Sequence, residues 1–215
     1  MSFPVLALDA AFGPAAATLI LGNDQRFYAE SPESKPHSQT ILPMCEHLLQ
    51  QASLTWQSLA LLALGIGPGS FTGVRVTAAS LAGMNASLKR PLLSLSSLAI
   101  TAAQAASVDE TWVLEDARAE EAYVGCYRKH DATQADTCMP WIQVETLPPA
   151  SFVCHGTPTW TLNGWQQQPL VKNRAEALAD MVLHQLQTTA IDTLPTYTQP
   201  AYLQPSQAER NAGHG

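Results

Sequence analysis

The segment GIGPGSFTG, residues 65–73, is a glycine-rich stretch between two strongly patterned parts of the chain. The apolar run LALLAL (59–64) before it predicts a buried strand, and VRVTAASLAGMNASLK (74–89) after it predicts a helix. A glycine-rich turn from a strand into a helix is a common phosphate site, because glycine permits close backbone approach and the helix start offers free N–H groups. The candidate phosphate- or nucleotide-binding residues here are Gly67, Gly69, Ser70, Thr72 and Gly73.

This loop matches none of the specific phosphate-binding fingerprints. No lysine follows the glycines as GxxxxGK[ST] requires, and Thr72 stands where GxGxxG has its last glycine. Pro68 replaces the first glycine of GxSxG, so Ser70 is not at a nucleophile elbow. The residues alone leave a structural turn and a working phosphate site both open.

Asp9 is a further candidate, because it lies inside the apolar run PVLALDA (4–10). A buried carboxylate is costly unless it is paired or hydrogen-bonded. Its side chain could hold water or Mg²⁺ near a phosphate, or it could cap the next turn. The sequence does not decide between these two roles.

The order of patterned segments predicts an α/β protein with a mixed sheet. Three short strands (4–10, 15–21 and 25–30) are joined by tight turns, and helices then alternate with buried strands. Strands are also expected at 111–117 and 121–128, whereas residues 129–150 are expected to be irregular. A break near residue 107 divides the chain into an N-terminal lobe (1–106), a smaller C-terminal lobe (107–205) and a frayed tail (206–215).

Composition indicates a globular protein that does not bind nucleic acid directly. Apolar residues make up 46% of the 215 residues and charged residues 13%. Eleven basic residues and a net charge of −7 do not supply the clustered positive charge that a polyphosphate needs. Neither a signal peptide nor a membrane span is expected, and four widely spaced cysteines favour reduced thiols in the cytoplasm. The histidines show no zinc-binding spacing, so no metal ligands are predicted.

Six segments, read together, resemble the TsaB (YeaZ) family of bacterial tRNA threonylcarbamoyladenosine biosynthesis proteins, relatives of TsaD. They cover almost the whole chain in the family's order, and the most specific is GPGSFTG after a buried strand with HxQxxLPM upstream. The segments are VLALDAA (5–11), HSQTILPM (37–44), GIGPGSFTGVRV (65–76), PLLSLSSLA (91–99), DARAEEAY (116–123) and PAYLQ (200–204).

The resemblance implies the actin-like ATPase (ASKHA) fold, with two RNase H-like lobes whose mixed sheets are flanked by helices. It implies a non-catalytic subunit that pairs with TsaD, the enzyme that modifies the adenosine beside the anticodon in tRNAs reading A-starting codons. TsaE would join this assembly, TsaC would supply the threonylcarbamoyl donor, and tRNA would be contacted only through the complex. No cofactor is implied for the chain itself, and ATP or ADP is a candidate ligand at the interface of the complex.

Three departures from the related motifs argue against independent chemistry. Residues 97–101 read SLAIT where TsaD has its metal-binding HMEGH, so neither end carries a strong metal ligand. Ala10 follows Asp9 where the family usually has threonine, and Gln204 ends the PxYLR motif in place of arginine.

The resemblance also makes the two helices beside the loop candidate partner surfaces. An apolar stripe runs along residues 41–52, and small residues recur along residues 74–88. Without TsaD, the same surface could pair with itself in a twofold homodimer. The interface candidates are Ile41, Met44, Cys45, Leu48, Val74, Arg75, Ala78, Ala79, Ala82, Gly83 and Ala86.

Two other functions compete with the scaffold role. One is an ATPase or kinase of the same fold that uses Asp9 and the Gly67–Gly73 loop. The other is a peptidase, for which the sequence offers no nucleophile with a base and no metal set.

Overall fold

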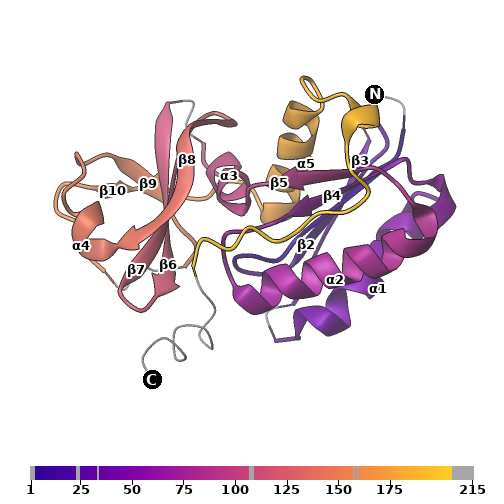
Figure 1. Ribbon diagram of the computed structural model, residues 1–215, viewed down its shortest axis with the longest axis horizontal. Helices are drawn as coiled ribbons and strands as arrows, with labels where there is room; N and C mark the ends of the chain where they lie inside the picture. The colour runs from indigo at the N-terminus through magenta and orange to yellow at the C-terminus, as the bar shows by residue number, and fades with distance from the viewer. Residues whose placement is uncertain are drawn as a thin grey trace.

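The first of two five-stranded sheets contains the predicted meander. The computed structural model describes residues 3–22, 25–32, 34–106, 109–156, 158 and 160–204. The strand order is β3-β2-β1-β4-β5, with β1, β2 and β3 antiparallel and β1, β4 and β5 parallel (Figure 1). The predicted mixed sheet is therefore confirmed. The strands are β1 (Val5–Asp9), β2 (Ala16–Ile20), β3 (Arg26–Glu30), β4 (Leu61–Gly65) and β5 (Leu92–Leu95).

The second sheet repeats the topology of the first. Its order is β8-β7-β6-β9-β10, again three antiparallel strands in sequence followed by two parallel ones. No internal repeat in the sequence indicates that the strand topology is duplicated. The two matching sheets nevertheless confirm the expected pair of RNase H-like lobes. The strands are β6 (Glu110–Arg118), β7 (Glu121–Arg128), β8 (Asp131–Pro140), β9 (Ser151–Val153) and β10 (Gln166–Gln167).

The prediction that residues 129–150 are irregular was wrong. Ten of them form β8, and a short helix follows. β8 is an edge strand whose first half is exposed, so its sequence lacks the apolar alternation that identifies a half-buried strand. Pairing with β7, rather than local pattern, makes it a strand.

Helices cover both faces of the first sheet. α1 and α2 pack on one face and α5 packs on the other, whereas α3 lies between the two sheets and contacts α5, β6 and β7 (Figure 1). α5 follows the second sheet in sequence yet packs on the first sheet. The lobe boundaries at 1–106 and 107–205 remain a prediction. The predicted tail, 206–215, lies outside the described residues. The helices are α1 (His37–Gln51), α2 (Phe71–Leu88), α3 (Ser97–Ala103), α4 (Trp141–Val144) and α5 (Arg174–Gln185), with single 3₁₀ turns at Trp56–Ser58 and Ile191–Thr193.

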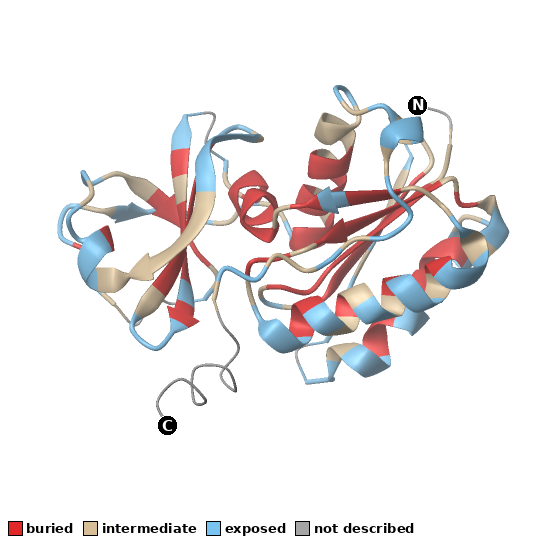
Figure 2. Cartoon of the chain, viewed as in Figure 1, coloured by how far each residue is buried: buried red, intermediate tan, exposed pale blue. Residues whose placement is uncertain are grey.

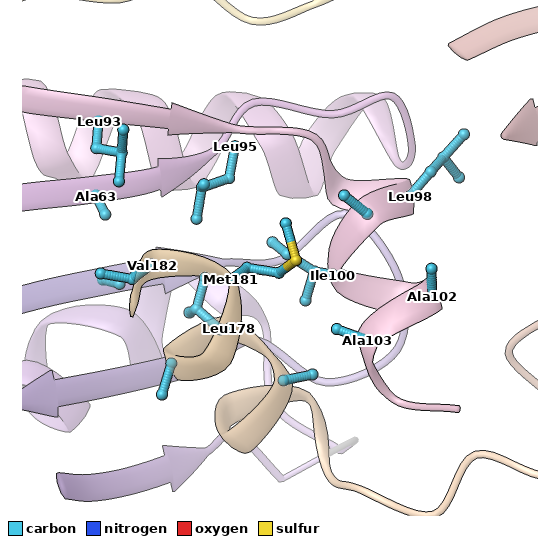
Figure 3. Packing of buried hydrophobic residues seen from close by; sticks show 14 of the residues in the cluster. Ala63, Leu93, Leu95, Leu98, Ile100, Ala102, Ala103, Leu178, Met181 and Val182 are labelled. Atoms are coloured by element: carbon cyan, nitrogen blue, oxygen red, sulfur yellow. The ribbon is translucent and has the colours of Figure 1, made fainter. Parts of the chain in front are cut away.

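One hydrophobic cluster joins the two sheets. All seven residues of α3 are buried, and Ile100 packs with Leu178 and Met181 of α5 (Figures 2 and 3). Val113 and Tyr127 of the second sheet belong to the same cluster. The short helix α3 is therefore the apolar centre of the contact between the lobes.

No helix in the described parts of the chain is long and apolar enough to cross a membrane. Within those same residues, no three histidine, cysteine or acidic side chains gather as a metal site would require. The four cysteines are free, and burial raises the pKa of the Cys45 and Cys154 thiols to about 12.

Asp136 is expected to give the contact between the sheets a pH dependence. This β8 carboxylate accepts hydrogen bonds from Ser96, the N-cap of α3, and from Tyr127 of β7. Burial raises the pKa of Asp136 above its ordinary value of 3.8, and the two hydrogen bonds offset this only in part. Between the pKa of the unfolded chain and the higher pKa of the folded protein, the folded protein binds more protons. The contribution of Asp136 to the free energy of unfolding therefore falls as the pH rises through that window.

The Asp136→Asn variant is therefore expected to have a flatter stability profile than the parent protein. Urea unfolding at a series of pH values from acidic to neutral measures it. The difference in unfolding free energy between variant and parent should shift in the variant's favour as the pH rises. A difference that is constant with pH would contradict the assignment.

Candidate functional site

Asp9 lies at the end of β1 and is fully buried. Its Oδ2 receives a hydrogen bond from Arg174 Nε at 2.6 Å, and its Oδ1 receives one from Ser97 Oγ at 2.6 Å. The Ala11 backbone N–H also donates to Oδ2, at 3.2 Å. The capping interaction that the sequence allowed is therefore present, and the main partner of the carboxylate is an arginine 165 residues away.

Arg174 is the first residue of α5 and is 2% exposed. Its guanidinium donates to Thr101 Oγ1 (3.1 Å), Gln104 Oε1 (3.3 Å) and the Ser97 carbonyl (3.2 Å). The planar guanidinium thus bridges β1 to both ends of α3, an arrangement that its fixed fork of donors permits. We refer to Asp9, Ser97, Thr101, Gln104, His155 and Arg174 as the Arg174 cluster.

His155 brings the second sheet into this cluster. Its Nδ1 lies 2.7 Å from Glu115 Oε1 of β6, and its Nε2 lies 3.4 Å from Arg174 Nη1. Because a carboxylate can only accept, Nδ1 carries the proton, and Nε2 is then an acceptor that shares the two Nη1 hydrogens of Arg174 with Thr101 and Gln104. Phe12, from the turn after β1, stacks on the imidazole with ring centroids 5.8 Å apart.

The glycine-rich loop fits tightly against the β1–β2 turn. A Cβ on Gly65 would lie 1.8 Å from Asp9 Oδ1, and one on Gly73 would lie 1.9 Å from the Ala10 carbonyl oxygen. Gly69, at φ +151°, would place a Cβ 2.7 Å from that of Ala11. These glycines are needed for close packing of the chain against itself.

Several donors of the loop are used internally. The Gly67 N–H donates to Ser97 Oγ (3.0 Å), and the Ser70 N–H donates to the Ala11 carbonyl (2.8 Å). Ser70 is the N-cap of α2, and its Oγ accepts from the Gly73 N–H (3.2 Å). Thr72 is exposed and lines, with Ser70, a hollow of about 450 Å³ beside the start of α1. Phosphate binding by Asp9 and the loop stays a prediction, and this geometry does not favour it, because the Asp9 carboxylate is committed to Arg174.

The interface candidates divide between the core and the surface. Those on α1 are a correction: Ile41, Met44, Cys45 and Leu48 are buried beneath the helix, against the first sheet, and present nothing to a partner. Val74 is buried as well. The apolar stripe of α1 is explained by its own sheet, which an amphipathic pattern alone cannot distinguish from a partner.

The remaining candidates form one outward face of α2, visible in Figure 2. Arg75, Ala79, Ala82 and Ala86 are separated by three or four positions and so share one side of the helix, and Ala78 and Gly83 lie beside them. A Cβ built on Gly83 meets nothing within 4 Å. Ala78 is half-buried, and the exposed members are Arg75, Ala79, Ala82, Gly83 and Ala86.

A C-terminal strap, residues 195–204, adds to this face and was not recognised from its sequence. It crosses the edge of the first sheet beside β5 (Figure 1), with the Ala201 N–H donating to the Ile66 carbonyl at 2.8 Å. Tyr202 OH accepts from Arg75 Nε at 2.9 Å, and the Arg75 guanidinium lies 3.7 Å from the centre of the Phe71 ring. The motif PAYLQ was the available signal, and its role is to bring an aromatic side chain onto α2.

The sequence is similar to those of known proteins. The family model "TsaD: tRNA N6-adenosine threonylcarbamoyltransferase" matches residues 31–208. The "tRNA threonylcarbamoyladenosine biosynthesis protein TsaB" of Escherichia coli is 34% identical over 132 residues, which are 59% of this chain and 56% of that protein. An uncharacterized protein of Mycobacterium tuberculosis is 31% identical over 125 residues, 57% of this chain and 58% of the relative. The chain thus spans less than two thirds of the length of these relatives.

Solved structures have the same fold. YeaZ from Pseudomonas aeruginosa superposes with a TM-score of 0.68 at 25% identity, covering 91% of this chain and all of that one. A second Pseudomonas aeruginosa structure, described as similar to peptidase YEAZ, gives a TM-score of 0.70 at 23% identity over 94% of this chain. With its family model covering most of its length, the chain belongs to the TsaD family, and in sequence and fold it resembles the TsaB (YeaZ) members of that family.

Proposed function

We propose that this protein acts in N6-threonylcarbamoyl modification of tRNA adenosine, as a non-catalytic subunit that pairs with TsaD through the outward face of α2. TsaE and TsaC would act in the same pathway, and tRNA would be bound only through the complex. The observation that carries the proposal is the exposed small-residue face of α2 in a member of this family.

The metal-binding positions support a non-catalytic role. Ser97 and Thr101 stand where the ends of the TsaD motif would be, and both are buried. The Ser97 hydroxyl donates to Asp9, and Thr101 Oγ1 donates to the Ser97 carbonyl and accepts from Arg174. These side chains are occupied in tying α3 to β1 and α5, which leaves no ligand for metal-assisted transfer at these positions.

The shape of the α2 face suits a close helix contact. Ala79, Ala82, Gly83 and Ala86 let a partner backbone approach the helix axis, and Arg75, Phe71 and Tyr202 border this region with charge and aromatic surface. A stable complex buries roughly 1,200–2,000 Å² in total, which needs more than one helix. The strap and the exposed side of α1 would extend the contact, and a twofold homodimer would use the same face in the absence of TsaD.

The Gly83→Trp variant is expected to disrupt pairing with TsaD without disrupting the fold. Nothing lies within 4 Å of a Cβ at this position, and tryptophan is a better helix former than glycine, so the variant is expected to fold like the parent. A bulky ring in the centre of the contact should weaken pairing with TsaD at least about tenfold, measured by co-purification and titration calorimetry. Ala135→Trp, on the exposed part of edge strand β8, is the matched control and should pair normally.

Reconstitution tests the pathway. TsaD, TsaE and TsaC are expected to modify tRNA only when this chain is added, and the Gly83→Trp variant should fail to support them. Full transferase activity of the isolated chain would overturn the non-catalytic role. Normal pairing and normal activity with Gly83→Trp would overturn the α2 interface while leaving the pathway open.

A further inference from the structure

We propose that the Arg174 side chain itself fills the site between the two sheets. Its guanidinium holds the two lobes in their relative orientation without any bound small molecule. The site it fills is made by residues from three separate parts of the chain. Asp9 comes from β1, Ser97, Thr101 and Gln104 come from α3 and the residue after it, and His155 comes from the loop after β9.

Nearly every N–H group of the guanidinium has a hydrogen-bond acceptor. Nε donates to Asp9, Nη1 to Thr101 and Gln104, and Nη2 to the Ser97 carbonyl. A buried cation is tolerated only with a counter-charge and satisfied hydrogen bonds, and both are present here. Such a set of acceptors is specific for a planar, forked cation rather than for a point charge.

The backbone that carries the Arg174 side chain is also held in a fixed position. Glu30 of β3 accepts hydrogen bonds from the backbone N–H groups of Arg174 (2.7 Å) and Ala175 (3.2 Å). Asn173 and Glu176 form a capping box around the same turn. The start of α5 is thus fixed to the first sheet before the guanidinium reaches across.

The link to the second sheet runs through one imidazole. Glu115 orients His155 through Nδ1 and also accepts from its backbone N–H, and this leaves Nε2 directed at Arg174 Nη1. Phe12 stacks on the same ring, and its ring centre lies 5.6 Å from the Arg174 guanidinium carbon. Loss of the guanidinium would remove the polar connection from α5 to His155.

Chemical rescue of Arg174→Ala tests this assignment. Hydrogen exchange of the full-length variant is expected to rise about tenfold or more in the two segments that face each other across the site, 10–13 and 154–156. N-ethylguanidinium, which replaces the deleted atoms, should restore protection and raise the melting temperature of the variant at concentrations that leave the parent protein unchanged. N-ethylammonium carries the same charge without the fork and should restore little.

Arg26→Ala is the matched control, because Arg26 pairs with Asp180 of α5 at a half-buried position outside the cluster. Its stability should not respond to N-ethylguanidinium. Parent-like protection of both segments in Arg174→Ala overturns the proposal, as does equal rescue by N-ethylammonium or equal rescue of Arg26→Ala. If Arg174→Ala does not fold, Arg174→Lys keeps the charge but loses the fork, and parent-like exchange in that variant overturns the proposal as well.

Discussion

Replacing Gly73 by alanine is expected to lower the free energy of unfolding by about 3 kcal/mol or more, although alanine is the better helix former. The new Cβ would lie 1.9 Å from the Ala10 carbonyl oxygen and 3.0 Å from its carbon, and both are backbone atoms that cannot rotate away. Relief would require α2 to move off the β1–β2 turn, which would break the Ser70 N–H to Ala11 carbonyl hydrogen bond. Urea denaturation of the variant measures the loss.

Gly83→Ala in the same helix is the control for this prediction. A Cβ at Gly83 meets nothing within 4 Å, so only helix propensity changes, and a gain of up to about 1 kcal/mol is expected. The two variants make the same chemical change in one helix with opposite expected signs. Equal effects of the two substitutions would show that α2 does not contact the turn as described.

Arg174→Met is expected to cost about 3–5 kcal/mol of stability, because it leaves Asp9 as a buried carboxylate without its counter-charge. Asp9 is fully buried, and only Ser97 and the Ala11 N–H would remain as its partners. For a chain of this size such a loss lowers the melting temperature by roughly 6–20 °C. Differential scanning calorimetry and urea denaturation both measure it.

The double variant Asp9→Leu/Arg174→Met is expected to be more stable than Arg174→Met alone. Removing both charges together abolishes the uncompensated carboxylate, and well-packed apolar pairs often replace buried ion pairs at little cost. A double-mutant cycle then gives a coupling energy of several kcal/mol between the two positions. Additive effects would mean that the 2.6 Å contact contributes no specific stabilisation.

Much of the first sheet could be predicted, because its strands are short apolar runs between turn signals. The second sheet was harder to predict, since β8 is an exposed edge strand and β10 has only two residues. For the site, the glycine loop and Asp9 were found by pattern, but their partners were not. Arg174 did leave one signal: a cation at the first position of a helix opposes the helix dipole and therefore needs a specific reason to be there.

The amphipathic stripe of α1 shows what a sequence pattern cannot predict, namely what an apolar helix face contacts. Its periodicity correctly predicted a helix with one apolar face, but it did not say whether that face meets the chain's own sheet or another protein. Burial of Ile41, Cys45 and Leu48 settles this in favour of the sheet, whereas Ala82 and Gly83 of α2 remain open. The candidate partner surface could therefore be separated from the core only once the helices had been placed.

The sequence by itself determined the strands and helices of the first lobe, the resemblance to the TsaB (YeaZ) family and the lack of strong metal ligands at Ser97 and Thr101. The elements and the two side chains are local properties, and the resemblance rests on six short segments in order, so none of them requires the contacts between distant residues. Only the tertiary structure decided that GIGPGSFTG packs against the turn after Asp9 and that Arg174 neutralises this carboxylate. The reason is physical: the pairing of a buried charge depends on which groups folding brings within hydrogen-bonding distance, and here they lie 165 residues apart.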